Sequence, residues 1–182
     1  MTECIGIGGS ASAMDEPEKI AEEKAFWRFS LAFYERPGVA DALIALQDRD
    51  GFDVNLILFA LWLGISGRGP LGDALASAER VAGALRSDIV EPLRSLRRKL
   101  RHHPDGDVQK LREGVKALEL AGEKLVQERL ARLAASGCAK ACPGDRRAAA
   151  HSNLALYLGS EGVRSKEAAV IEDALDAFAQ DL

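Results

Sequence analysis

The stretch FWRFSLAFYERPGVADALIALQDRDGFDVNLILFALWLG, residues 26–64, decides the fold class of this chain. Up to Tyr34 its large apolar side chains fall on nearly every side of a helix, which is typical of a helix buried in a core. Pro37 ends that helix and favours the start of the next one, because proline disfavours helical backbone in the residue before it. Asp53 can cap a third helix through its carboxylate. These helices are expected near residues 18–35, 38–49 and 56–63.

The middle of the chain predicts a long antiparallel helix hairpin. Its first helix, near residues 71–101, has apolar residues at every seventh position, which is typical of a coiled-coil seam. They are Leu75, Ala82, Ile89 and Leu96. Pro92 predicts a kink or a break in this helix, after which Leu93, Leu96 and Leu100 continue the inward stripe. The returning helix is expected near residues 107–134.

Two further helices, near residues 146–158 and 165–182, complete the prediction, and no alternating run of β-branched residues competes with it. The sequence therefore predicts an all-α fold, a compact bundle of about six to seven helices with the long antiparallel hairpin at its centre. A length of 182 residues favours one domain, over residues 16–182. Residues 1–15 are rich in Gly, Ser and Ala and are expected to form a disordered leader.

Composition excludes several functional classes. A formal net charge of −4 gives no general attraction to nucleic acid or to anionic lipid. The strongest apolar run, residues 54–65, is far shorter than the roughly 20 residues that span a bilayer. An odd number of cysteines, 3, without a secretory leader predicts reduced thiols and a cytoplasmic protein.

The quoted stretch resembles a family of small proteobacterial proteins catalogued only as a domain of unknown function. The resemblance continues more weakly through VEPLRSLRRKLR, residues 90–101, and VKALELAGEKLVQERL, residues 115–130. It covers roughly residues 20–135 and implies a bacterial, cytoplasmic, helical protein. No catalytic residue follows from it. The loop at residues 136–145 and the Gly-rich leader fall outside the pattern.

The sharpest charge feature is a basic helix face near the end of the first hairpin helix. Its members fall at i, i+3, i+4 and i+7 and therefore share one face, opposite the leucine stripe. They are Arg94, Arg97, Arg98 and Arg101. The face is a candidate docking site for a protein partner. The alternative is that these cations pair with glutamates of the returning helix, such as Glu119, Glu123 or Glu128, and complement the dipole at the helix end.

A second candidate is an apolar pocket between the aromatic first helix and the helix near residues 54–65. Its candidate lining residues are Trp27, Tyr34, Asn55 and Trp62. Asn55 is the polar group of interest, because a buried amide must find hydrogen-bond partners. The alternative interpretation is a local hydrogen bond within the turn that Asp53 caps.

No constellation supports catalysis, a metal or a cofactor. The run Asp48, Asp50, Asp53 and Asn55 fails the calcium-loop template, because position six from Asp48 is not glycine and no Glu lies at position twelve. Cys138-x-x-x-Cys142 lacks the second ligand pair of a structural zinc site, and the role of these thiols is left open. No nucleophile elbow or phosphate loop is present. No catalytic residue, metal or cofactor is therefore predicted.

We expect a helical binding or regulatory protein that docks an unknown protein partner through the basic face. The alternative is a small enzyme or apolar-ligand carrier that uses the pocket. Homo-oligomerisation is left open, whereas the charge and the apolar run argue against nucleic acid and membrane as partners.

Overall fold

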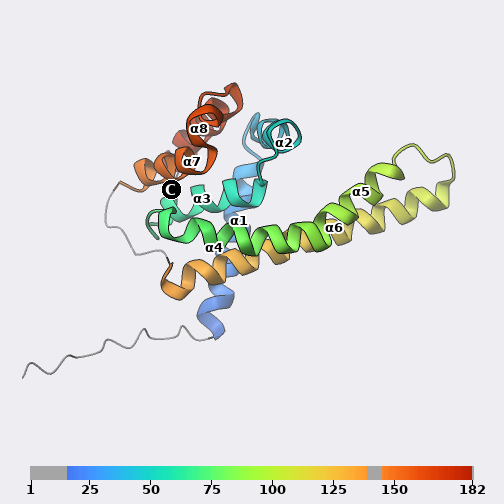
Figure 1. Cartoon of the computed structure of the whole chain (residues 1–182), viewed down its shortest axis with the longest axis horizontal. Coiled ribbons are helices and arrows are strands. Elements are labelled where there is room, and N and C mark those ends of the chain that lie inside the picture. Colours follow the sequence, from blue (N-terminus) through green and yellow to red (C-terminus); the bar gives the residue numbers. More distant parts are fainter. Residues whose placement is uncertain (1–15, 139–144, 182) are drawn as a thin grey trace, which may run out of the picture.

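The computed structural model describes residues 16–138 and 145–181, and within these ranges the chain is almost entirely helical, without a strand (Figure 1). The elements in chain order are α1 (Glu16–Tyr34), α2 (Val39–Asp50), α3 (Val54–Ile65), α4 (Gly72–Leu85), η1 (Arg86–Val90), α5 (Glu91–Lys99), α6 (Gly106–Leu133), η2 (Ala134–Cys138), α7 (Arg146–Gly162) and α8 (Lys166–Gln180). Since η1 and η2 are π-helical segments continuous with their neighbours, the described chain forms seven rods. The predicted all-α bundle is confirmed.

Two expectations fall on parts of the chain outside the described residues. They are the disordered leader at residues 1–15 and the Cys142 end of the late cysteine pair. Elsewhere the predicted helix ends agree with the structure to within a few residues. Asp53 caps α3 as expected, because its Oδ1 accepts the backbone N–H of Asn55 at 2.8 Å.

Helix α3 forms the centre of the core, because every residue from Leu56 to Ile65 is buried. Its main neighbour is α7, and the two backbones come close together where Gly64 faces Ala150. A Cβ atom at Gly64 would overlap the backbone of Ala150, so glycine is required for this approach. None of the described helices combines the length and the apolar character that crossing a bilayer requires.

The predicted hairpin is present as α4, η1 and α5 running antiparallel along α6 (Figure 1). Gly122 of α6 allows close packing, since a Cβ atom there would meet the Ile89 and Val90 side chains at 3.3 and 3.4 Å. The distal half of the hairpin, α5 with the first turns of α6, extends beyond the body as an arm.

The π-helical segment η1 changes which side of α5 faces inward. A π-helical turn holds one residue more than an α-helical turn, so the inward positions move forward by one. Val90 and Arg94 are buried, whereas Leu96 is 43% exposed. The prediction that Arg94 faces outward and Leu96 inward is therefore wrong, whereas Leu93 and Leu100 of the predicted stripe are half-buried. The interruption expected at Pro92 is η1, and the chain stays helical through the proline because it lies in the first turn of α5.

Candidate functional site

A groove of about 750 Å³ lies between α1, the start of α3, the edge of α2 and the α5–α6 arm. It is open to solvent along one side. Its walls expose apolar side chains that a folded protein normally covers: Leu31 is 47% exposed, Ile44 is 45% exposed and Leu120 is 52% exposed. Trp27 and Tyr34 complete the apolar wall on α1. The groove therefore offers a mostly apolar surface with charged groups at one end.

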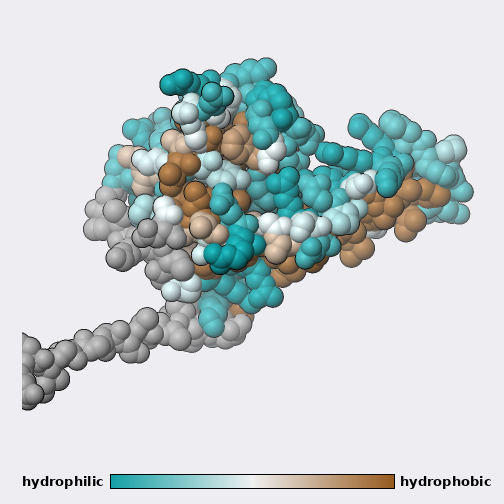
Figure 2. All heavy atoms as spheres, in the orientation of Figure 1, coloured by the Kyte–Doolittle hydropathy of each residue, from teal (hydrophilic) through white to brown (hydrophobic). Residues whose placement is uncertain are grey.

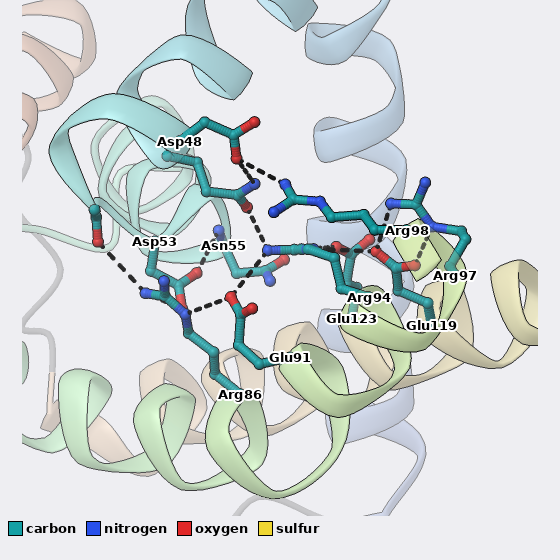
Figure 3. A network of polar contacts seen from close by, with 12 residues as sticks. Asp48, Asp53, Asn55, Arg86, Glu91, Arg94, Arg97, Arg98, Glu119 and Glu123 are labelled. Carbon is teal, nitrogen blue, oxygen red and sulfur yellow. Dashed lines mark hydrogen bonds and ion pairs between the residues drawn. The ribbon is translucent and has the colours of Figure 1, made fainter. Parts of the chain in front are cut away.

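The charged end is organised around Arg94, which is 8% exposed (Figure 3). Its Nε donates to Glu119 at 3.1 Å and its Nη2 donates to Glu123 at 2.7 Å. Its Nη1 donates to Gln47 at 2.9 Å and to Glu91 at 3.2 Å. Each nitrogen of the guanidinium is thus used inside the chain. Arg94 connects α2, α5 and α6 at the bottom of the groove.

The other arginines of the basic face lie progressively nearer to solvent. Arg97 donates to Glu119 through Nε and also through Nη2, the latter at 3.1 Å. Arg98 is paired with Asp48 of α2 at 3.0 Å, and its side chain is 55% exposed. Arg101 is exposed at the end of the arm. The structure therefore contains the predicted pairing with Glu119 and Glu123, whereas docking through this face stays a prediction.

Burial and pairing shift the ionisation of the two central glutamates in opposite directions. Burial opposes the charge on Glu119, but hydrogen bonds from Arg97 and Arg94 outweigh it and hold the pKa of this carboxyl below its usual value. Burial raises the pKa of Glu123 above its usual value, although Arg94 acts against the rise. The two glutamates that share Arg94 therefore differ in how readily they take up a proton.

Buried polar atoms in the groove lack hydrogen-bond partners. Ser30 and Gln127 are each 4% exposed and line the groove, yet the Ser30 Oγ and the Gln127 Oε1 have no partner among the described residues. The Gln127 Nε2 donates to the Asn55 Oδ1 at 3.0 Å, so the amide is held with its free oxygen in a fixed place. Unsatisfied buried polar atoms cost free energy and mark sites where another molecule can supply the missing bond.

A family model described as a protein of unknown function, DUF2390, matches residues 25–130, more than half of the chain. The chain belongs to the DUF2390 family. No curated protein and no solved structure matches it. All groove-lining residues, from Trp27 to Gln127, lie inside the DUF2390 region, whereas α7 and α8 lie outside it. The groove is thus a feature of the segment that defines the family, and the proteobacterial source stays a prediction.

Three of the four pocket residues predicted in the DUF2390 region line this groove: Trp27, Tyr34 and Asn55. Trp62 does not, because it is 3% exposed and stacks on Phe26 with ring centroids 4.9 Å apart. The groove therefore opens against α6, and the space between α1 and α3 is filled by this aromatic packing. The side chain of Asn55 reaches Gln127 of α6, so the local turn contact considered for it is not its role.

Sequence reasoning missed Ser30, Gln127 and the wall residues Leu31, Ile44 and Leu120. Gln127 interrupts the apolar spacing of α6 next to Val126 and Leu130, which is the signal that could have found it. The two predicted sites, the basic face and the pocket, also meet in one place. Arg94, Arg97 and Arg98 line the same groove as Trp27, Tyr34 and Asn55.

Proposed function

We propose that this protein binds a small amphipathic molecule, mostly apolar with at least one N–H or O–H group, in the groove between α1 and the α5–α6 arm. The observation that carries the proposal is a pair of buried oxygens in the lining of that groove, Ser30 Oγ and Gln127 Oε1, for which the described part of the chain supplies no hydrogen-bond partner. A volume of about 750 Å³ lies within the range of roughly 300–1,000 Å³ that is usual for small-molecule sites.

The chemistry of the ligand follows from the lining. The apolar walls, which include Leu31, Ile44 and Leu120, favour an apolar body. The carbonyl oxygen of Gln127 can only accept a hydrogen bond, so its partner must be a donor. The Ser30 hydroxyl can donate or accept, and the Tyr34 hydroxyl offers the same choice. One donor placed deep in the groove, with apolar surface around it, satisfies these features together.

The arginine network gives the groove a fixed shape before a ligand enters. Arg94 ties α5 and α6 to Gln47 of α2, and Arg98 ties the arm to Asp48 of the same helix. A preformed site loses less conformational entropy on binding than a flexible one. In this proposal the arginines position the walls, and the affinity comes from the apolar surface and the deep hydrogen bond.

The test uses N-phenyl-1-naphthylamine, a fluorescent probe that is apolar and carries one N–H donor. We expect its emission to rise when it is mixed with the full chain, and Leu120→Glu, which places a charge on the groove wall, to abolish the rise. Leu156→Glu is the matched control, because Leu156 is 50% exposed on α7 and lies away from the groove. Equal binding by both variants, or no binding by the wild type, would reject the proposal.

A second probe tests the hydrogen bond itself. The N-methyl derivative of the same amine keeps the rings and loses the donor. We expect its affinity to be lower by about two- to twelvefold, since a hydrogen bond to a buried acceptor is worth roughly 0.5–1.5 kcal/mol. In Gln127→Leu the two probes should bind alike, which ties the difference to this oxygen.

Protein docking is the second candidate, and the exposure of Arg98 and Arg101 at the rim of the arm favours it. Arg98→Glu combined with Arg101→Glu should leave the fold intact, because exposed ion pairs contribute only about 0–1 kcal/mol each. Loss of partner capture by this folded variant, with capture by the wild type that weakens as salt is raised, supports docking through the basic face. Arg97→Glu is unsuitable, because it would place a carboxylate against buried Glu119.

A further inference from the structure

A second apolar surface lies along α6, on the flank opposite the groove. Leu111 and Leu118 are each 60% exposed, and Leu125 follows at the same seven-residue spacing and is half-buried. Gly114 and Ala121 lie between the leucines, also seven residues apart, and both are exposed. Figure 2 shows hydrophobic side chains gathered along this edge of the arm. Alternating large and small residues on a heptad spacing are typical of a seam between two closely packed helices.

No described element of the chain covers the part of this seam that holds Leu111, Gly114 and Leu118. The side of α6 that α5 and η1 pack against carries other residues, Val115, Glu119 and Gly122, which are buried. A Cβ atom added at Gly114 would meet no atom within 4 Å, so the seam is open at its narrowest residue. The arm therefore presents a helix face with the spacing of a helical interface and without a helix on it.

Charges at the two ends of the seam select one orientation of a second α6 helix. Asp107 lies eleven residues before Leu118 and Arg129 lies eleven residues after it, and both are exposed. Antiparallel pairing centred on Leu118 places Asp107 of each copy opposite Arg129 of the other, and Leu111 opposite Leu125. Parallel pairing would place like charges together at both ends, which is unfavourable.

We propose that a second copy of this chain docks on the seam, α6 against α6 and antiparallel, in a dimer with its twofold axis at Leu118. The surface is self-complementary, as a twofold interface requires. The two arms together make a four-helix bundle, in which the exposed leucines of each hairpin are covered by the other. This dimer is independent of the groove, because the seam and the groove lie on opposite flanks of α6.

Sedimentation of the full chain at micromolar concentration tests the dimer. We expect the wild type to sediment as a dimer and Leu118→Glu, which brings two carboxylates together at the axis, to sediment as a folded monomer. Leu156→Glu on α7 should remain dimeric. A wild type that is monomeric, or a Leu118→Glu variant that dimerises like the wild type, overturns the proposal.

Cysteine pairing tests the orientation. In a background where Cys4, Cys138 and Cys142 are replaced by Ser, Leu111→Cys and Leu125→Cys are made as separate chains. Under mild oxidation we expect the mixture to give a disulfide between the two variants, whereas neither variant alone should cross-link. Cross-linking of each variant with itself would show parallel pairing and would overturn the proposal.

Charge reversal tests the antiparallel orientation by a measurement of dimerisation that does not depend on oxidation. Arg129→Asp should weaken dimerisation at least tenfold, because each end of the seam then holds two carboxylates. Adding Asp107→Arg should restore the wild-type dimer, because the opposite charges are paired again in exchanged places. Failure of the double change to restore the dimer would contradict the antiparallel register.

Discussion

Gly64 of α3 and Ala150 of α7 approach so closely that no Cβ atom fits between them. We expect Gly64→Ala to lower the free energy of unfolding by about 1–3 kcal/mol, the usual cost of overfilling a packed core. Helix propensity alone would act the other way, because Ala favours a helix over Gly by about 1 kcal/mol. Urea denaturation followed by circular dichroism measures the net effect.

Gly83 of α4 is the matched control for this substitution. It also lies inside a helix, but a Cβ atom there would meet nothing within 4 Å. Gly83→Ala should therefore stabilise the protein by about 0.4–1 kcal/mol. If both substitutions stabilised the protein, this result would contradict the close packing of α3 against α7 at Gly64.

Asn153 is predicted to be among the most costly polar side chains to remove. It is 2% exposed, accepts the backbone N–H of Leu71 at 2.8 Å and donates to the carbonyls of Ala60 and Gly69 at 3.1 and 3.2 Å. Asn153→Leu removes the side-chain partner of three buried backbone groups, so we expect a loss of about 2–4 kcal/mol. Ser152→Ala, at the exposed neighbouring position, should change stability by less than about 0.5 kcal/mol.

The Arg94–Glu119 pair should make stability sensitive to acid. The pKa of Glu119 in the folded protein lies below its value in the unfolded chain. The ion pair therefore contributes its full stabilisation at pH values above the unfolded pKa of about 4.3, and this stabilisation is lost as the pH falls through the folded pKa. Glu119→Gln should cost about 2–4 kcal/mol at neutral pH and flatten the acid limb of the stability curve. Urea denaturation between neutral pH and strong acid measures both effects.

Glu113→Gln is the control for the acid dependence. The Glu113 carboxylate also pairs with an arginine, Arg112, but its side chain is exposed to solvent. Its loss should cost less than about 1 kcal/mol and leave the acid limb as in the wild type. Identical acid limbs for Glu119→Gln and the wild type would contradict the role assigned to Glu119.

Both tyrosines should titrate above the ordinary range. Burial raises the pKa of Tyr157 to about 12 and raises the pKa of Tyr34, the latter with a contribution from Glu123. Ultraviolet absorbance should therefore show no phenol ionising at the ordinary pKa of about 10 while the protein is folded. Because the folded pKa values of both tyrosines are raised, the stabilisation that each neutral phenol gives the folded state is fully present below pH ~10. It is lost as the pH rises through the folded pKa values. Tyr157→Phe should remove the ionisation step near pH 12.

The helices could be predicted from the sequence because their determinants are local. The Asp53 cap, the break at Pro37 and the apolar spacing of α6 each act within a few residues. The register of α5 could not be predicted, because seven-residue spacing continues unchanged through η1 and gives no sign of the π-helical turn. Burial of Arg94 depends on that turn and on glutamates more than twenty residues away.

The groove was only partly predictable, because its lining depends on contacts between residues that are far apart in the sequence. Trp27, Tyr34 and Asn55 stood out as large or polar residues near an apolar segment, but which aromatic fills the core depends on tertiary packing. The Trp62 ring stacks on Phe26, and the guanidinium carbon of Arg68 lies 4.8 Å from the centroid of the Trp62 ring. The Trp62 indole is therefore packed in the core and does not line the groove. Asn153 carried no local signal at all, because its partners lie at residues 60–71, far away in sequence.

The π-helical segment η1 also determines where the chain can lose a residue. Because it stores one residue beyond an α-helical turn, deleting one there, for example Ser87, lets a regular α-helix run from α4 into α5. The helix beyond the deletion then keeps its direction, and Arg94 still faces Glu119. A deletion inside α4 removes no stored residue and turns α5 by about 100° about its axis. Shortening by one residue is therefore tolerated at η1 and disruptive in the helix before it.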